Sequence, residues 1–274
     1  MKMLSGIALS LLFAASTAFA QVIPDQYIVV LNNNVANPGN TARGLAGQNG
    51  VNLGHIYSNS IRGFSFTGSA AAAQAIARNP NVAYVEADLV AQAINQELVN
   101  GVNRVDADLV EFIDGGLVYS MIAGNDYLLD VDIAILDTGI DGNHPELNVV
   151  GGKHFYSINS GRPQNRGSFF DDNYDDDAGH GTHVAGTIAA RDNDSGVVGV
   201  APGASLWAVK VLDANGSGSF SDVIAGIDYV TANADLIEVA NMSLSGLGRL
   251  DSLRSAIQNS VAAGVVYVVA AGND

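Results

Sequence analysis

Between residues 21 and 94, short apolar segments alternate with small-residue segments along the chain. The apolar segments are rich in Val, Ile, Phe and Tyr and predict strands, whereas the Ala-rich segments predict helices. The predicted strands are residues 26–31, a pair within residues 55–67, and residues 82–86, and the predicted helices are residues 41–48 and 70–78. Pro80 ends the second helix. The order β-α-β-β-α-β predicts a small ferredoxin-like α+β domain.

From residue 131 onward, near-continuous apolar segments alternate with segments of helical pattern. The expected strands are residues 131–136, 206–212, 236–242 and 265–270, and the expected helices are residues 180–191, 220–233 and 252–263. Strands without polar alternation are buried on both faces, and helices between them cover those faces, so the pattern predicts an α/β fold with a doubly wound parallel sheet. We expect residues 265–270 to form a central, buried strand, which would lack its remaining cover in a chain that stops at residue 274. Sheets of this kind bind ligands beyond the carboxyl ends of their strands.

The composition is that of a packed, acidic protein. Apolar residues make up 48% of the chain, and 28 acidic residues against 12 basic ones give a formal net charge of −16. This charge opposes binding to nucleic acid or to an anionic membrane, because both of these partners are also negatively charged. It is compatible with carboxylate sites for hard cations. Since the chain has no cysteine, disulfides, thiolate metal sites and a Cys nucleophile are excluded.

The N-terminus has the pattern of a secretory signal peptide. Lys2 precedes a mostly apolar run over residues 3–15, and small residues follow up to Ala18-Phe19-Ala20. The run is too short for a membrane-spanning helix, and no second segment reaches spanning length without charge. We therefore expect residues 1–20 to be removed and the protein to be secreted, either outside the cell or into a periplasm.

Three stretches place chemically useful side chains at the ends of predicted elements. In Gly179-His180-Gly181, an imidazole that exchanges protons near neutral pH stands at the start of a helix, between glycines that allow close approach. Asp137 and Asn273 each follow an apolar strand, where ligands of a parallel sheet bind. His183, one turn further along the helix, is expected to be a core residue.

Taken together, these stretches resemble the subtilisin-like serine proteases (subtilases). The resemblance rests on three segments in the order of that family, Ile135-Leu136-Asp137-Thr138-Gly139, Gly179-His180-Gly181-Thr182-His183 and Ala270-Ala271-Gly272-Asn273. It implies an Asp-His-Ser triad in which Asp137 orients His180, His180 is the general base and acid, and Asn273 donates to the oxyanion. The family's Gly-Thr-Ser-Met-Ala segment, which carries the nucleophile, does not occur before residue 274. We therefore expect the chain to be truncated before its nucleophile and inactive by itself.

The resemblance also implies two segments that hold an extended peptide substrate. Residues 241–246 resemble the segment that pairs with the substrate backbone and walls the P1 pocket, and residues 216–220 resemble the opposite strand. The implied substrate-binding residues are Ser217, Gly218, Phe220 (at the P4 pocket), Ser243, Leu244, Ser245, Ala270 and Gly272. Residues 216–220 are also compatible with a Gly/Ser loop before a helix capped by Ser219 or Ser221, and both interpretations can hold together.

Two carboxylate-rich loops suggest cation sites. Residues 191–197 resemble the loop that binds structural calcium in the family. By position, Ca²⁺ would be bound by the side chains of Gln96, Glu146 and Asn193 and by the carbonyl groups of Arg191, Ser195 and Val197. Glu146 stands where Asp is more usual. Residues 171–177 contain five Asp, for which a solvated loop is the first interpretation and a weaker second calcium site is the alternative.

The N-terminal domain resembles the inhibitory, folding-assisting propeptide of the family, both by its position after the signal and by the segment Asn81-Val82-Ala83-Tyr84-Val85-Glu86. The resemblance implies a propeptide over residues 21–94, cleavage between Ile94 and Asn95, and a partial subtilisin-like catalytic domain over residues 95–274. The expected partners are protein or peptide substrates and the chain's own propeptide. We expect a monomer that has no membrane association once the signal is removed.

A second class of function remains open. The protein could be a non-enzymatic secreted inhibitor or binding protein that uses its N-terminal domain, with an inert core. The two hypotheses differ in whether a serine-bearing segment is encoded beyond Asp274.

Overall fold

The computed structural model describes residues 21–93, 111–114, 117–120, 130–156, 170–193, 196–246 and 248–272. The expected signal peptide, the expected cleavage site between Ile94 and Asn95, and three expected site residues lie outside these ranges; the three are Gln96, Ser195 and Asn273. The expected domain boundaries therefore stay predictions. In the described ranges, no helix combines the length and the apolar character needed to cross a membrane.

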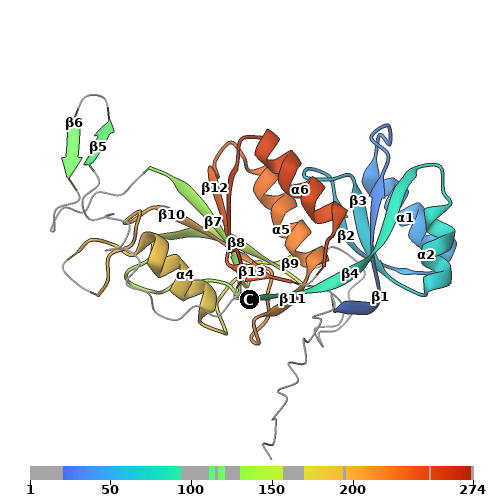
Figure 1. Ribbon diagram of the computed structural model, residues 1–274, viewed down its shortest axis with the longest axis horizontal. Helices are drawn as coiled ribbons and strands as arrows, with labels where there is room; N and C mark the ends of the chain where they lie inside the picture. The colour runs from blue at the N-terminus through green and yellow to red at the C-terminus, as the bar shows by residue number, and fades with distance from the viewer. Residues whose placement is uncertain are drawn as a thin grey trace, which may run out of the picture.

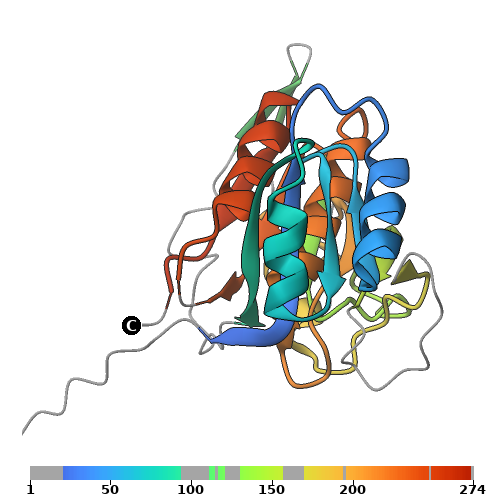
Figure 2. The same cartoon turned by 90° about the vertical axis from the view of Figure 1, so that its right-hand side faces the viewer.

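The N-terminal domain is an antiparallel sheet whose outer face is covered by two helices (Figure 2). Its elements are β1 (Val22–Leu31), α1 (Pro38–Asn49), β2 (Asn52–Tyr57), β3 (Gly63–Thr67), α2 (Ala70–Ala77) and β4 (Val82–Ala93). The strands are ordered β4-β1-β3-β2, which confirms the predicted α+β unit. Both helices begin at side-chain caps, since Asn37 accepts from the Asn40 amide and Ser69 from the Ala72 amide.

The second domain is built on a six-stranded sheet with the order β14-β12-β7-β10-β8-β9. The strands are β7 (Asp132–Asp137), β8 (Val149–Phe155), β9 (Phe170–Asp171), β10 (Ser205–Lys210), β12 (Val239–Met242) and β14 (Val266–Val269). All pairs are parallel except β8 with β9. Helix α4 (His180–Ala189) covers one face, and α5 (Phe220–Ala232) and α6 (Asp251–Ala262) cover the other, between this sheet and the N-terminal domain (Figure 1). The predicted doubly wound sheet is confirmed.

The central strand β7 shows why the sheet is covered on both faces. Ile133 and Ile135 belong to the apolar cluster on the α4 side. Ala134 and Leu136 belong to the cluster on the α5 side. Because side chains of a strand alternate between the two faces, an unbroken apolar run can be fully buried only between two layers of helices.

Strand β8 was not predicted, because its sequence breaks the apolar pattern with Gly151, Gly152 and Lys153. The glycines have a packing reason. A Cβ at Gly152 would lie 2.3 Å from the carbonyl oxygen of Ala208, and one at Gly151 would lie 2.9 Å from the ring of Trp207. The close approach of β10 thus excludes, at these two positions, the β-branched side chains from which a strand is usually predicted.

The strand expected at residues 265–270 is β14, and it lacks cover in this chain, as expected. Among the described strands, β14 pairs with β12 alone and forms an edge of the sheet. Its side chains are exposed, with fractions of 58% for Val266, 51% for Val268 and 57% for Val269. An apolar run indicates that a strand can be buried, but it does not indicate how many neighbouring strands and helices cover it.

The two domains are joined by the end of β4. Residues 82–86 were predicted as the last strand of the N-terminal domain. The strand in fact continues to Ala93, and its end pairs with β11 (Ser217–Ser219) and β13 (Leu244–Ser245) of the second domain.

A separate antiparallel pair is formed by β5 (Glu111–Asp114) and β6 (Leu117–Ser120).

Candidate active site

The expected acid and base meet at the carboxyl end of β7. Asp137 is its last residue and is fully buried, and His180 is the first residue of α4. The Nδ1 atom of His180 lies 2.6 Å from Oδ1 of Asp137. Because an ionised carboxylate can only accept, Nδ1 carries the proton and Nε2 keeps the basic lone pair. This is the arrangement that general acid–base chemistry by an imidazole requires.

Glycines allow α4 to begin this close to the strand. A Cβ at Gly181 would lie 2.1 Å from the carbonyl oxygen of Gly139 and 3.2 Å from Cβ of Asp137. Gly139 and Gly179 have φ angles of 112° and 86°, which L side chains rarely adopt. The glycines around His180 therefore allow the start of α4 to lie close to the end of β7, and this close approach was predicted from the sequence. His183, in contrast, is exposed on α4, so its assignment as a core residue is wrong.

A peptide segment already lies in the expected substrate site. The end of β4 pairs antiparallel with β11, with Val90, Ala91 and Gln92 opposite Ser219, Gly218 and Ser217. On its other side, Gln92 and Ala93 pair with Ser245 and Leu244 of β13. Since β11 and β13 follow the carboxyl ends of β10 and β12, this three-stranded arrangement lies along the edge of the sheet where Asp137 stands (Figure 1).

The side chains around this segment leave room for a small residue. Ala91 is fully buried in the apolar cluster that contains Phe220 and Leu244. A Cβ at Gly246 would lie 2.6 Å from the Phe220 ring and 2.8 Å from the carbonyl oxygen of Val90. Ala91 is thus buried in the same apolar cluster as Phe220, the residue expected at the P4 pocket.

The other expected substrate residues lie nearby in the same segments. Ser243 is buried, and its Oγ accepts from the side chain of Asn241 at 3.0 Å. The alternative role of the Gly/Ser loop is also realised, because Ser219 Oγ caps α5 by accepting from the Asp222 amide at 3.2 Å. Ala270 and Gly272 follow the carboxyl end of β14, at the same edge of the sheet.

Carboxylates of the N-terminal domain cap two helices of the second domain. Glu86 accepts from the amides of Asp251 and Ser252 at the start of α6, and Asp88 accepts from the amide of Ser221 at the start of α5. Negative charge at a helix N-terminus is favourable, because the free amides and the helix dipole point toward it. Burial raises the pKa of Asp88 to about 6, with the nearby Asp222 adding to the effect and hydrogen bonds opposing it.

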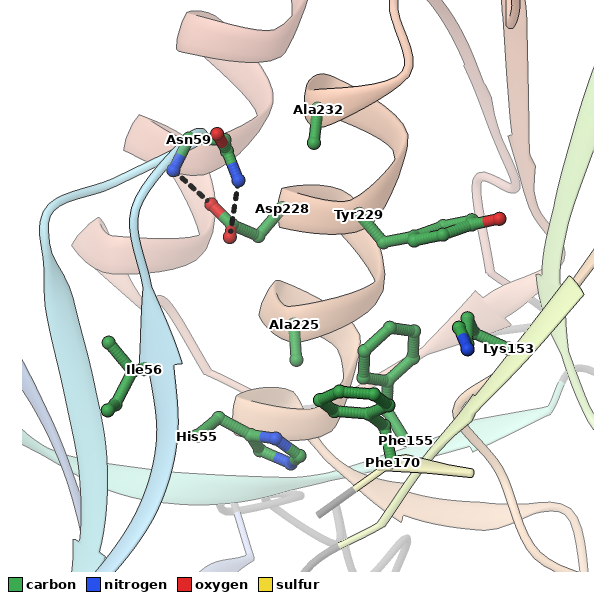
Figure 3. Close-up of a pocket in the computed structure, with 10 residues that line it drawn as sticks. All are labelled: His55, Ile56, Asn59, Lys153, Phe155, Phe170, Ala225, Asp228, Tyr229 and Ala232. Atoms are coloured by element: carbon green, nitrogen blue, oxygen red, sulfur yellow. Dashed lines mark hydrogen bonds between the residues drawn. The ribbon is translucent and has the colours of Figure 1, made fainter. Parts of the chain in front are cut away.

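The second domain also contributes a carboxylate to the interface, and this one accepts from amides of the N-terminal domain. Asp228 of α5 accepts hydrogen bonds from the backbone amides of Ser58, Asn59 and Ser60, at distances from 2.6 to 3.3 Å. Figure 3 shows Asn59 reaching Asp228 above a small pocket that is also lined by aromatic side chains. His55 Nε2 contacts Asp222 Oδ1 at 2.8 Å.

The sequence interpretation missed these interface carboxylates. One signal for them is the spacing of Glu86 and Asp88, which places both side chains on one face of a strand. The partners of these side chains are 133 to 166 residues away along the chain, so no local pattern could identify them.

The expected calcium ligands are only partly described. Glu146 and the loop at 191–197 lie together, because the Arg191 amide donates to the Glu146 carbonyl oxygen at 3.1 Å. A Cβ at Gly196 would lie 3.7 Å from the Glu146 carboxyl carbon. Glu146 Oε2 is buried and has no hydrogen-bond partner among the described residues. These observations fit a cation site that is completed by carbonyl and amide oxygens.

The Asp-rich loop is not simply solvated. Asp171 contacts His154, Asp172 pairs with Lys153, and Asp177 pairs with Lys210. Asp176 is half-buried and accepts hydrogen bonds from its own loop and from α4. In the part of the chain that the structure describes, no three His, Asp or Glu side chains are grouped as metal ligands would be.

The fold and this geometry define a class of protein: a doubly wound sheet with an Asp–His pair at its carboxyl edge and an N-terminal domain whose last strand enters the adjoining cleft. Residues 130–274 match the model of the subtilase family (Peptidase S8), and residues 26–93 match that of the peptidase inhibitor I9 family. The chain belongs to the subtilase family, and its N-terminal domain is an I9 inhibitor domain.

Relatives support the same assignment. The chain is 39% identical to Subtilisin E of Bacillus subtilis over 203 residues, which cover 74% of this chain and 47% of the relative. It is 46% identical to Subtilisin DY of Bacillus licheniformis over 145 residues (53% and 47%), and 39% identical to M-protease of Shouchella clausii over 199 residues (73% and 46%). The chain thus spans about half the length of the curated relatives it matches.

Proposed function

We propose that the protein is the precursor of a secreted serine endopeptidase, with the I9 domain as its intramolecular inhibitor. The observation that carries this proposal is the end of β4, which lies as an extended strand between β11 and β13 at the edge that holds Asp137 and His180. An inhibitor that occupies the position of a peptide substrate blocks access to the site and also indicates which ligand the site accepts.

In the proposed reaction, a serine hydroxyl attacks the scissile carbonyl carbon, and Nε2 of His180 takes the hydroxyl proton. Asp137 accepts from Nδ1 and stabilises the imidazolium that forms. Asn273 donates to the negative oxygen of the tetrahedral intermediate. His180 then gives the proton to the leaving amine, and water repeats the sequence to release the acyl group. The serine is expected in the part of the relatives' length that these residues do not cover.

The register of β4 supports a defined cleavage site. Ala91 lies in the apolar cluster that contains Phe220, and with Ala91 as the P4 residue, Gln92 and Ala93 follow as P3 and P2, so Ile94 would be the P1 residue. Maturation would then cut between Ile94 and Asn95. The inhibitor would remain in place after the cut as a bound product, held by its pairing and by the helix caps at Glu86 and Asp88.

We also propose a structural calcium ion held by Gln96, Glu146 and Asn193 with carbonyl groups of Arg191, Ser195 and Val197. The orphaned Oε2 of Glu146 supports this, because a buried carboxylate oxygen without a donor is costly unless a cation satisfies it. Bound calcium would supply no reaction step. It would tie Glu146 to the loop after α4.

Calcium should therefore raise the thermal stability of the protein. At a hundredfold excess over its Kd, an ion that binds only the folded state adds about 2.7 kcal/mol. We expect the melting temperature to be several degrees higher in excess calcium than in chelator, and this difference to be reduced in Glu146→Gln. Equal melting temperatures of the unaltered protein in both conditions would remove the site from the proposal.

The competing hypothesis is an inhibitor or binding protein with an inert core. Expression of the gene to its natural stop codon, beside residues 21–274 alone, separates the two. We expect the long form to hydrolyse casein and to be labelled by a serine-directed fluorophosphonate at a serine beyond Asp274, and His180→Ala to abolish both. Labelling of the short form that is lost in His180→Ala would show that the nucleophile is misplaced. A long form that neither hydrolyses nor labels favours the inert core.

A further inference from the structure

Asp176, in the loop before α4, collects five hydrogen bonds on one carboxylate. Its Oδ1 accepts from Oγ1 of Thr138 at 2.8 Å, from the Ala178 amide at 3.0 Å and from the Gly179 amide at 2.8 Å. Its Oδ2 accepts from the amide of Thr182 at 2.8 Å and from Oγ1 of Thr182 at 2.6 Å. Gly179 cannot cap α4 with a side chain, so Asp176 supplies the acceptor for the first amides of the helix.

One of these donors, Thr138, connects Asp176 to the acid–base pair. Thr138 directly follows Asp137, and its amide donates to Asp137 Oδ1 at 2.7 Å, the oxygen that also receives His180. The Thr138 hydroxyl accepts in turn from the amide of Gly181, which directly follows His180, at 2.9 Å. Asp176 is therefore linked to Asp137 through Thr138, and to the two neighbours of His180 in the chain: to Gly179 directly and to Gly181 through Thr138.

The opposite side of Thr138 is held as well. The buried ammonium group of Lys210 donates to the Thr138 carbonyl oxygen and to Asp177 Oδ1. Lys210 lies beside Asp137 in the register of β10 with β7. With its amide, hydroxyl and carbonyl all engaged, Thr138 has little freedom to rotate or shift. Its hydroxyl contacts α4 in two ways, directly through the Gly181 amide and indirectly through Asp176, which accepts from Thr182.

The chemistry of the donors requires that Asp176 be ionised. Five donors fill both oxygens, and a protonated carboxyl would direct its own hydrogen against one of them. Partial burial acts to raise the pKa of Asp176, but the hydrogen bonds from Thr182, Gly179 and Thr138 outweigh burial and lower it. A fixed negative charge therefore stands at the N-terminus of α4 throughout the neutral range.

We propose that Asp176 is a positioning residue for the reaction, which holds Asp137 and His180 in register through Thr138 and the first turn of α4. This inference rests on the proposed function of the Asp137–His180 pair. It assigns to one member of the Asp-rich loop a task that the loop's charge alone does not suggest. Asp176 touches neither the substrate segment nor the two reacting side chains in any described contact.

The test compares Asp176→Asn with Asp175→Asn in the full-length enzyme. The Asn side chain keeps the shape of Asp176 but turns an amide group toward Thr182, or toward Thr138 and the loop amides, so that donor faces donor. Asp175 is exposed and adjacent, so its replacement removes the same charge without these contacts. We expect kcat of Asp176→Asn to fall roughly ten- to a hundredfold, as for a small displacement of a reacting group, with KM within about twofold.

The pH profile adds a readout that a merely structural role would not change. Losing a nearby negative charge and loosening Asp137 both disfavour the imidazolium form of His180. We therefore expect the acid limb of kcat/KM to move to lower pH in Asp176→Asn and to move much less in Asp175→Asn, because the exposed charge of Asp175 is screened by water. Thr138→Val should show the same shift of the acid limb as Asp176→Asn. Thr138→Ser keeps the hydroxyl group and should retain the profile of the unaltered enzyme.

A nuclear magnetic resonance titration of His180 keeps the proposal testable apart from turnover. If the unaltered protein shows no proteolysis, the proposed function fails, while a lower His180 pKa in Asp176→Asn would still support the positioning role. The role is overturned if Asp176→Asn is folded and matches Asp175→Asn in kcat, acid limb and His180 titration. It is also overturned if Asp176→Asn loses activity only in proportion to its lost stability, with an unchanged acid limb.

Discussion

The acid–base site and the interface between the two domains both depend on buried carboxylates, but the origins of their partners differ. Around Asp137, every described donor belongs to the second domain itself. At the interface, Glu86 and Asp88 of the inhibitor domain accept from amides of α6 and α5, respectively. In return, Asp228 of α5 accepts from amides of the turn at residues 58–60 of the inhibitor domain, called the inhibitor turn below. The site can therefore keep its geometry without the inhibitor, whereas each side of the interface is incomplete without the other.

The difference has an energetic consequence. When the inhibitor leaves, the first amides of α5 and α6 and the carboxylate of Asp228 exchange protein partners for water, so each hydrogen bond lost there costs only about 0.5–1.5 kcal/mol. Many such modest terms give an interface that is specific and still reversible. In the site, by contrast, one altered partner disturbs the reacting atoms directly.

The largest expected effect comes from the site. Asp137→Asn keeps the shape of the side chain but removes the acceptor that fixes the tautomer of His180. By analogy with the corresponding change in chymotrypsin-like enzymes, we expect kcat to fall by about four orders of magnitude. Binding of the cleaved inhibitor should be almost unchanged, because no inhibitor contact involves this side chain among the described residues. A stopped assay with a chromogenic peptide measures the first effect, and dissociation of the inhibitor measures the second.

An intermediate effect is expected at the interface. Asp228→Ala removes the acceptor for three successive amides of the inhibitor turn. We expect the cleaved inhibitor to dissociate about ten to a hundred times faster, for a loss of roughly 1–3 kcal/mol. Peptide hydrolysis by the mature enzyme should stay the same. Asp235→Ala, at an exposed position after the same helix, is the matched control. Equal dissociation rates for the two variants would contradict the reciprocal interface.

The smallest expected effect concerns pH. The pKa of Asp88 is about 6 in the docked state, against an ordinary value of 3.8 once the residue is exposed. Docking therefore takes up a proton between these values, so the contribution of Asp88 is full below about pH 4 and is lost as the pH rises to 6. We expect inhibitor release to become faster across this window, and Asp88→Asn to flatten the dependence. An identical pH dependence in both proteins would show that groups other than Asp88 control it.

Much of the fold was readable from the sequence because its strands and helices are locally consistent. Unbroken apolar runs gave β7, β10 and β12, and small-residue stretches gave α1, α2 and α4. Strand β8 was missed, because close packing against β10 demands glycines that lack any strand signal. The apolar run at residues 265–270 gave β14, whose side chains are exposed in this chain because burial depends on neighbouring elements that no local pattern describes.

The candidate site divides in the same manner. Asp137 and His180 stand out by motif and by position at element ends, and the structure brings them within hydrogen-bond distance. The roles of Asp176 and Asp228 depend on residues that are 38 and 168 positions away, so their sequences look like ordinary loop and helix positions. Long-range hydrogen bonds of this kind become visible only when the chain is folded.

The central claim is that the end of β4 lies in the substrate position and is cut there by the Asp137–His180 machinery. N-terminal sequencing of the mature protein after purification of the full-length precursor tests this most directly, with His180→Ala processed in parallel. The account predicts a mature form that begins at Asn95, and a His180→Ala precursor that stays uncut. A start more than a few residues from Asn95, or the same cut in purified His180→Ala, would contradict it.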